Sequence, residues 1–229
     1  MKQLQGSAAS VRERFAEVEQ RVAAAAAAAG RDPARVKVLV ATKYVAAADM
    51  GVLRDAGIRL IGENRAQDLV AKAALFGDAF EYHFIGHLQS RKTRLVLPLV
   101  TLIHSVSSVS VVQEIEARAT KATNVLLEVN IAEEPSKSGV APRLIDAFLW
   151  EASACPQARF SGLMCMPPLS AGHAETQRHF AHLRELAERL STAWRGTYTF
   201  DELSMGTSAD YEIAVTEGAT IVRVGSVLF

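Results

Sequence analysis

The sequence predicts an α/β fold, a single (β/α)8 TIM-type barrel with an extra N-terminal helix. Eight short apolar segments alternate with helical segments along the chain, and this alternation is typical of parallel strands joined by helical crossovers. The length of 229 residues matches the small end of the range for eight such units. An open, doubly wound sheet is the alternative, but no GxGxxG motif follows a strand to support it.

Each predicted strand is a run of apolar or β-branched residues that ends near a glycine or a polar residue. The first run is apolar throughout, which predicts a strand buried on both faces. The eight predicted strands are residues 36–42, 58–61, 81–85, 99–104, 124–130, 160–164, 200–204 and 220–224. The helices between them are predicted at about 46–56, 65–75, from 90, and at 108–120, 141–153, 173–193 and 209–216.

An additional helix is predicted before the first strand, at about residues 8–29. Apolar residues recur there at helical spacing, and an alanine run with high helix propensity follows them. Gly30 ends the helix. No linker divides the chain, so we expect one domain over residues 1–229, in which 1–32 form the N-terminal helix and its linker.

Composition excludes several classes of function. The 25 basic and 25 acidic side chains cancel, which argues against nucleic acid as a partner. The two cysteines, Cys155 and Cys165, are too few for a disulfide framework, and no Cys/His cluster predicts a metal site. The sequence has neither a signal-peptide pattern nor an apolar run of about 18 residues. A cytoplasmic protein without a membrane segment is therefore expected.

Lys43 stands where the first strand ends, in the sequence VKVLVATKYV. Two interpretations are open: its amine opens the following loop into solvent, or it lies at the mouth of the barrel, where substrates bind. In the second case, partial burial or a neighbouring cation would favour the neutral amine that forms Schiff bases.

The loops after the last two strands indicate a phosphate site. Residues 204–208 (SMGTS) combine a glycine with three hydroxyl side chains, and Gly225-Ser226 repeats this small, donor-rich chemistry. In such barrels these two loops are the recurrent phosphate site, and a helix opening after SMGTS would add its positive end. Gly206 would let the backbone approach the ligand. For Ser208 alone, helix capping is an equal alternative.

Arg223 is predicted to point into the barrel. Alternation in TIVRVGS places Ile221 and Arg223 on the interior if Val222 and Val224 face the helices. A buried guanidinium needs an acceptor. A carboxylate such as Glu202, or a ligand nitrogen or phosphate, would provide it.

These motifs together resemble one family. The chain is similar to the pyridoxal phosphate homeostasis proteins, which have the barrel fold of the alanine racemase N-terminal domain. The matching segments are VATKY around Lys43, IGEN at 61–64, HFIGHLQSRK at 83–92, SKSG at 136–139, GLMCMPP at 162–168, LSMGTSADYEIAVTEG at 203–218 and VRVGSVLF at 222–229.

The resemblance implies roles for particular residues. Lys43 would hold pyridoxal 5′-phosphate as a Schiff base, and Ser204, Gly225 and Ser226 would hold its phosphate with help from Gly206. Arg223 would lie near the pyridine nitrogen or the phosphate. The cofactor ring would lie between Asn64 and Met205. PLP-dependent apo-enzymes would be partners.

The leading hypothesis is a pyridoxal phosphate homeostasis protein without turnover, expected as a monomer. The alternative is an amino-acid racemase or decarboxylase, but such relatives add a mostly β domain for which this chain has no room. An arginine at the pyridine nitrogen also weakens the ring as an electron sink. A Schiff-base aldolase without cofactor is a third class. The candidate bases for turnover are His83, His87, Tyr44 and Cys165, and strand alternation predicts that Tyr44 faces away from the ring.

Overall fold

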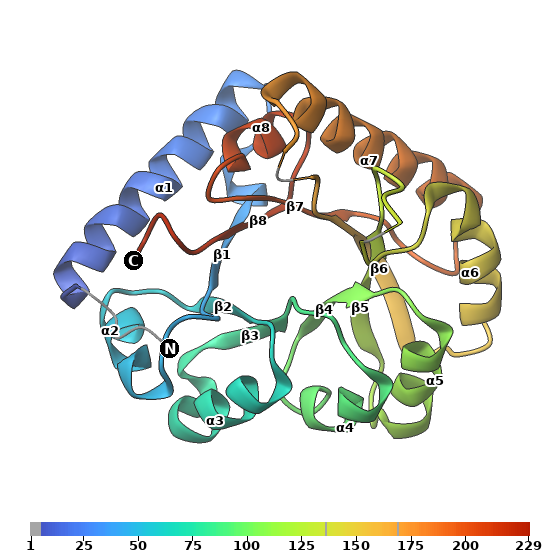
Figure 1. The fold of residues 1–229 in the computed structure, drawn as a ribbon, viewed down its shortest axis with the longest axis horizontal. Helices are drawn as coiled ribbons and strands as arrows, with labels where there is room; N and C mark the ends of the chain where they lie inside the picture. Colours follow the sequence, from blue (N-terminus) through green and yellow to red (C-terminus); the bar gives the residue numbers. More distant parts are fainter. Residues whose placement is uncertain (1–5, 136, 169) are drawn as a thin grey trace.

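The computed structural model describes residues 6–135, 137–168 and 170–229. Eight strands form a closed barrel in sequence order, β1-β2-β3-β4-β5-β6-β7-β8, and the pairing of β1 with β8 completes it in parallel. Figure 1 shows the helices as a ring around these strands. The predicted TIM-type architecture is confirmed. The strands are β1 (Lys37–Ala41), β2 (Leu60–Glu63), β3 (Glu81–Phe84), β4 (Leu102–Val106), β5 (Thr123–Val129), β6 (Ala158–Cys165), β7 (Glu202–Thr207) and β8 (Ile221–Val224).

The helices follow the strands in alternation, and several open with a short 3-10 turn. They are α1 (Ala8–Ala28), α2 (Met50–Asp55), α3 (Ala66–Phe76), α4 (Thr93–Val96), α5 (Val109–Arg118), α6 (Ile145–Ala152), α7 (His173–Ala193) and α8 (Tyr211–Thr216). Within the described ranges no helix is long and apolar enough to cross a membrane.

The extra N-terminal helix α1 packs beside the barrel. It contacts α8 and α2, and Figure 1 shows it on the outside of the ring. Its buried residues Val11, Val18 and Val22 lie on one face, as the helical spacing predicts. Because α8 has only six residues, α1 supplies the apolar cover that a longer last helix would give to this side.

The side chains of the strands divide into an inner and an outer layer. Five apolar residues form a cluster in the barrel interior: Leu39, Leu102, Leu126, Met164 and Ile221. The residues that alternate with them pack against the helices in the main core. On β8 this alternation places Ile221 and Arg223 inside and Val222 and Val224 outside, as predicted.

Three strands end at least two residues later than the sequence predicts. β2, β4 and β7 extend through Glu63, Val106 and Thr207, where the predicted ends were residues 61, 104 and 204. The pattern placed a loop at the first glycine or polar residue, but these residues continue to pair with the neighbouring strands. In β7 the register shifts between Ser204, which is opposite Ile221, and Thr207, which is opposite Arg223. β7 therefore has one extra residue, a β-bulge, that changes which side chains face inward.

Candidate functional site

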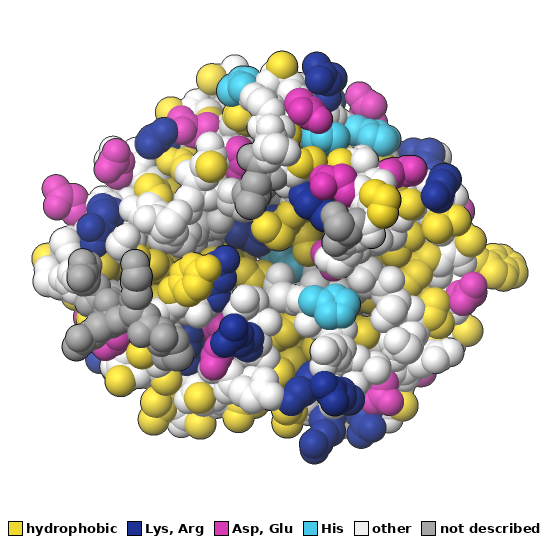
Figure 2. Space-filling model, viewed as in Figure 1, with side chains coloured by type: hydrophobic (Ala, Val, Ile, Leu, Met, Phe, Trp, Pro, Cys, Tyr) yellow, Lys and Arg dark blue, Asp and Glu magenta, His cyan; other side chains and the backbone are white. Residues whose placement is uncertain are grey.

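A cavity of about 1300 Å³ opens at the carboxyl end of the barrel. Figure 2 shows the corresponding hollow near the centre of one face of the molecule. Residues that follow β1, β2, β3, β7 and β8 line it, together with residues of β5 and β6. Five of the predicted site residues lie on its wall: Lys43, Asn64, Arg223, Gly225 and Ser226.

Lys43 lies in a turn two residues beyond the end of β1, with an exposed side chain. The N–H of Val45 closes this turn by donating to the Thr42 carbonyl oxygen. The Nζ atom of Lys43 lies 4.8 Å from the centre of the Tyr44 ring, and both residues line the cavity. The prediction that Tyr44 faces away is wrong, because strand alternation ends at Ala41 and does not extend into the turn.

A buried ion pair between Lys72 and Glu63 holds the backbone of the turn that contains Lys43. Lys72 of α3 and Glu63 of β2 have side chains that are 2% and 0% exposed. The Lys72 ammonium donates to Glu63 and to the Thr42 carbonyl oxygen, and the Thr42 hydroxyl donates to the same carboxylate. Sequence reasoning missed this pair, because a lysine within a helix resembles an ordinary surface residue until the fold brings it to Glu63.

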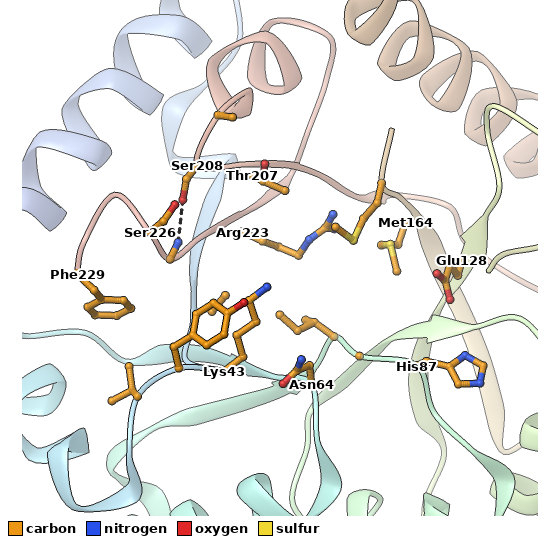
Figure 3. A pocket seen from close by; sticks show the side chains of 18 of the residues that line it. Lys43, Asn64, His87, Glu128, Met164, Thr207, Ser208, Arg223, Ser226 and Phe229 are labelled. Carbon is orange, nitrogen blue, oxygen red and sulfur yellow. Dashed lines mark hydrogen bonds between the residues drawn. The ribbon is translucent and has the colours of Figure 1, made fainter. Parts of the chain in front are cut away.

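The hydroxyl-rich end of the cavity is formed by the segments after β7 and β8. The N–H of Gly225 donates to Ser208 Oγ at 3.0 Å, which ties the two segments together (Figure 3). The N–H of Thr207 donates to Asp210 Oδ1 at 2.6 Å. Thr207, Ser208 and Ser226 all line the cavity. The helix expected to open here begins only at Tyr211 and is six residues long, so hydroxyl groups define this end.

Ser204, Met205 and Gly206 do not line the cavity. Ser204 is fully buried within the barrel, and Met205 packs in the outer layer against the helices. Gly206 has φ +90°, and a Cβ there would lie 2.5 Å from the Cβ of Ala214. This glycine therefore serves the close approach of α8 to β7. The bulge in β7 turns Thr207 toward the cavity in place of these three residues.

Arg223 is 6% exposed and reaches the cavity from its floor. Its Nη1 donates to the carbonyl oxygen and the hydroxyl of Ser204, and its Nη2 donates to the Cys165 carbonyl oxygen at 2.9 Å. Glu202 is not its acceptor, because that carboxylate binds Lys37 and the Thr220 hydroxyl. The guanidinium is thus anchored by neutral oxygens.

The opposite end of the cavity has a different chemistry. Figure 3 shows Glu128 and His87 there, across from Ser208, Ser226 and Phe229. Glu128 Oε1 accepts from Ser138 at 2.7 Å, whereas its Oε2 is buried without a hydrogen-bond partner. Burial raises the pKa of Glu128. Sequence reasoning did not find this carboxylate, because it is a single glutamate within an apolar strand.

Two further observations complete the site. The buried Oδ1 of Asn64 has no hydrogen-bond partner, and a Cβ on Gly86 would lie 2.2 Å from the Asn64 carbonyl oxygen, so a glycine is needed there.

In the SKSG motif, Ser136 lies outside the described residues. Lys137 is at the rim, with Nζ 3.4 Å from Glu134 Oε1. The described part of the chain contains no group of three or more His, Cys, Asp or Glu residues that would hold a metal ion.

The sequence and the fold both match known proteins. The profile of the alanine racemase N-terminal domain matches residues 14–229. A protein from Pseudomonas aeruginosa named pyridoxal phosphate homeostasis protein is 39% identical over 224 residues, covering 96% of this chain and 95% of that protein. A protein of the same name from Escherichia coli is 33% identical over 226 residues, covering 94% of each.

Among solved structures, PipY of Synechococcus elongatus with PLP bound has a TM-score of 0.81 and 32% identity, and the match covers 96% of this chain and 99% of that chain. The alanine racemase of Corynebacterium glutamicum has a TM-score of 0.69 at 13% identity, and the match covers 97% of this chain but only 60% of that one. This second likeness concerns the fold alone. The chain belongs to the pyridoxal phosphate homeostasis protein family, within the alanine racemase N-terminal domain family.

Proposed function

We propose that this chain binds pyridoxal 5′-phosphate and takes part in its homeostasis. One observation carries the proposal. The same cavity is lined by the primary amine of Lys43, the buried guanidinium of Arg223 and the hydroxyl-rich end, where Ser208 accepts from the N–H of Gly225. The names of the relatives and the cofactor bound in the PipY structure agree with it.

The residues present fit this group. Ser208 and Ser226 supply hydroxyl donors for a phosphate, whereas the Thr207 hydroxyl donates to Asp210 Oδ1 at 2.9 Å. The glycine at 225 leaves room beside the backbone of Ala41. Arg223 is the cation at the cavity floor and would face the ring nitrogen or the phosphate. Asn64 has an unpaired buried oxygen that can accept from a ring substituent. The role of Ser204 is indirect, because it touches Arg223 and not the cavity.

Pyridoxal phosphate, when bound, would supply an aldehyde group that condenses with a primary amine and releases water. In this chain Lys43 would provide that amine, since it lines the cavity and is exposed. Tyr44 covers one side of the amine. Ile85 and Met164 give the cavity apolar surface against which a flat ring can pack.

We propose that the protein holds the cofactor without turnover. Two of the expected bases are not placed to act: Cys165 is fully buried, and burial raises the pKa of its thiol to about 12. His83 is buried inside the barrel, away from the cavity wall. An arginine at the ring nitrogen also disfavours the electron withdrawal that racemases and decarboxylases use. Those activities are the alternative function.

Three expectations from the sequence stay predictions: delivery to PLP-dependent apo-enzymes, a monomeric state and a cytoplasmic location. We propose all three, together with the use of residues 1–229 as a single cofactor-binding unit. Size-exclusion chromatography with light scattering tests the oligomeric state. Recovery of activity by an apo-enzyme mixed with the loaded protein, compared with the same concentration of free cofactor, tests delivery.

Titration of the purified protein with pyridoxal phosphate tests the binding function. We expect a saturable absorbance band at longer wavelength than that of the free cofactor, and its loss on borohydride reduction. Pyridoxal without phosphate is the matched control and should bind more weakly. A protein that gains no such band, or that binds both compounds equally, would not be a carrier of the phosphorylated cofactor.

A further inference from the structure

A continuous line of hydrogen bonds joins the cavity to the opposite mouth of the barrel. It starts at Arg223 Nη1, which donates to Ser204 Oγ. Ser204 Oγ lies 2.8 Å from His104 Nδ1, and His104 Nε2 lies 2.9 Å from His83 Nδ1. His83 Nε2 lies 3.2 Å from Glu81 Oε1. Glu81 begins β3 at the amino-terminal mouth, and its side chain is 53% exposed.

The chemistry of the end groups gives this line one direction. The Arg223 guanidinium is a donor only, so Ser204 Oγ accepts from it and its own proton is available to His104 Nδ1. A neutral His104 then carries its proton on Nε2 and donates to His83 Nδ1. A neutral His83 likewise carries its proton on Nε2 and donates to the Glu81 carboxylate. All four links are satisfied, with both rings in the Nε2–H form.

The charges around the rings agree with this assignment. Burial, and then the neighbouring His83 and Arg223, hold the pKa of His104 well below its usual range, so this ring is neutral. The hydrogen bond from His83 lowers the pKa of Glu81 to about 2, so Glu81 is a carboxylate and an acceptor.

A proton added at the Glu81 end would reverse the line. A doubly protonated His83 donates from Nδ1 to His104 Nε2, and His104 then carries its proton on Nδ1 and donates to Ser204 Oγ. Ser204 Oγ would accept from His104 and Arg223 together, and its own proton has no other acceptor among the described residues. A hydroxyl oxygen can accept two hydrogen bonds, so in the reversed state the proton of Ser204 must turn from its place toward His104 to a new position beside the guanidinium.

We propose that His104 and His83 are positioning residues for Arg223, which hold the Ser204 hydroxyl in the orientation that accepts from the guanidinium. Protonation at the Glu81 mouth turns this hydroxyl and so couples the mouth to the cavity through the barrel interior. The line of hydrogen bonds is observed without any cofactor, whereas its effect on cofactor binding rests on the proposed function. The titratable groups around the line are Lys37, Glu81 and Glu202 at the mouth, and Arg223, Cys165 and Glu128 on the cavity side.

The first experiment uses the protein without cofactor. Two-bond ¹H–¹⁵N spectra of histidine-labelled protein near pH 8 report the tautomer of each ring, and His83→Gln and His104→Gln identify the signals. We expect the Nε2–H form for both. Ser204→Ala should give mixed tautomers at His104, and Ser204→Thr should restore one. A proton on His104 Nδ1 in the parent protein, or an unchanged His104 signal in Ser204→Ala, would overturn the proposal.

The second experiment follows the absorbance of the loaded protein against pH. Glu81→Gln removes the carboxylate that stabilises a protonated His83, so we expect its spectral transition at lower pH than in the parent. The matched control is Glu202→Gln, which removes one charge at the same mouth without contacting the line, and it should move the transition less. Equal displacement in both variants, or none, would contradict the coupling. Failure to bind the cofactor would reject the proposed function and leave the tautomer result intact.

Discussion

The ammonium of Lys72 donates to the backbone carbonyl oxygen of Thr42 at 2.8 Å. Thr42 immediately precedes Lys43, the lysine that lines the cavity. The same ammonium is paired with Glu63, and both side chains are buried. The position of Lys43 therefore depends on a charge pair in the layer between β2 and α3, and that dependence can be measured.

Lys72→Met is expected to destabilise the protein by about 3–5 kcal/mol, because it leaves the Glu63 carboxylate buried without its cation. The measurement is the free energy of unfolding in denaturant. The double variant Glu63→Leu/Lys72→Met removes both charges and should recover most of this loss. If the double variant is as unstable as the sum of the two single variants, the pair is not coupled in the way the structure indicates.

Lys43→Ala is expected to abolish the borohydride-trappable adduct while the unfolding transition is retained, because the exposed side chain contributes little to packing. Peptide mapping of the reduced protein locates the label. Lys137→Ala is the control, since Lys137 is a lysine at the rim of the cavity held near Glu134 and Met166, and the adduct should persist in it. A label found mainly on Lys137 in the parent protein would assign the reactive amine there.

Ser208→Ala is expected to weaken binding of pyridoxal phosphate by about 1–3 kcal/mol relative to pyridoxal, because a charged ligand loses a donor. Ser204→Ala is the matched comparison. Its hydroxyl lies beneath Arg223 and outside the cavity, so it should alter both affinities alike. Dissociation constants from absorbance titrations decide between them. A phosphate-selective loss in Ser204→Ala alone would restore the role that the sequence assigned to Ser204.

Local pattern was enough to predict much of this site. Strand alternation placed Arg223 inside the barrel, and the position of Lys43 and Gly225 after strands placed them at the carboxyl end. Which of Ser204 and Ser208 lines the cavity was not predictable, because β7 contains a bulge. A bulge shifts the inward alternation of the strand that carries it, but the segment SMGTS is too short and too polar for its sequence pattern to reveal a shift of one residue.

The pairing of Glu63 with Lys72 and the contact of His104 with Ser204 join separate elements of the chain. Sequence periodicity reports which face of an element is buried, but it does not report which polar groups meet across the fold. The histidines were therefore individually visible as candidates, while the line that they form became visible only in three dimensions.

Glu128→Gln is expected to raise the melting temperature of the unliganded protein at pH 8 and to have no effect near pH 4. Burial raises the pKa of Glu128 in the folded state, so folding favours the protonated form. The stability that this form provides is complete below the unfolded-state pKa and is lost as the pH rises through the folded-state pKa. Glutamine imitates the protonated form and can still accept from Ser138.

The measurement for Glu128 is a series of thermal unfolding curves across this pH range. The control Glu151→Gln removes a carboxylate that is exposed on α6, and it should shift the melting temperature little at any pH. A stabilisation by Glu128→Gln that is the same at pH 4 and pH 8 would show that ionisation of this carboxyl is not its cause.

No rapid exchange of the Cα hydrogen of amino acids is expected from the loaded protein in heavy water. Turnover needs a base beside the ring and a ring nitrogen that draws electrons. An arginine such as Arg223 beside that nitrogen would not favour the electron withdrawal. Of the expected bases, only His87 and Tyr44 line the cavity. Mass spectrometry of a panel of amino acids after incubation measures deuterium uptake. Uptake at about 1–10 per second, an ordinary enzymatic rate, that disappears in His87→Ala or Tyr44→Phe would make this protein a catalyst, and the carrier function would have to be abandoned.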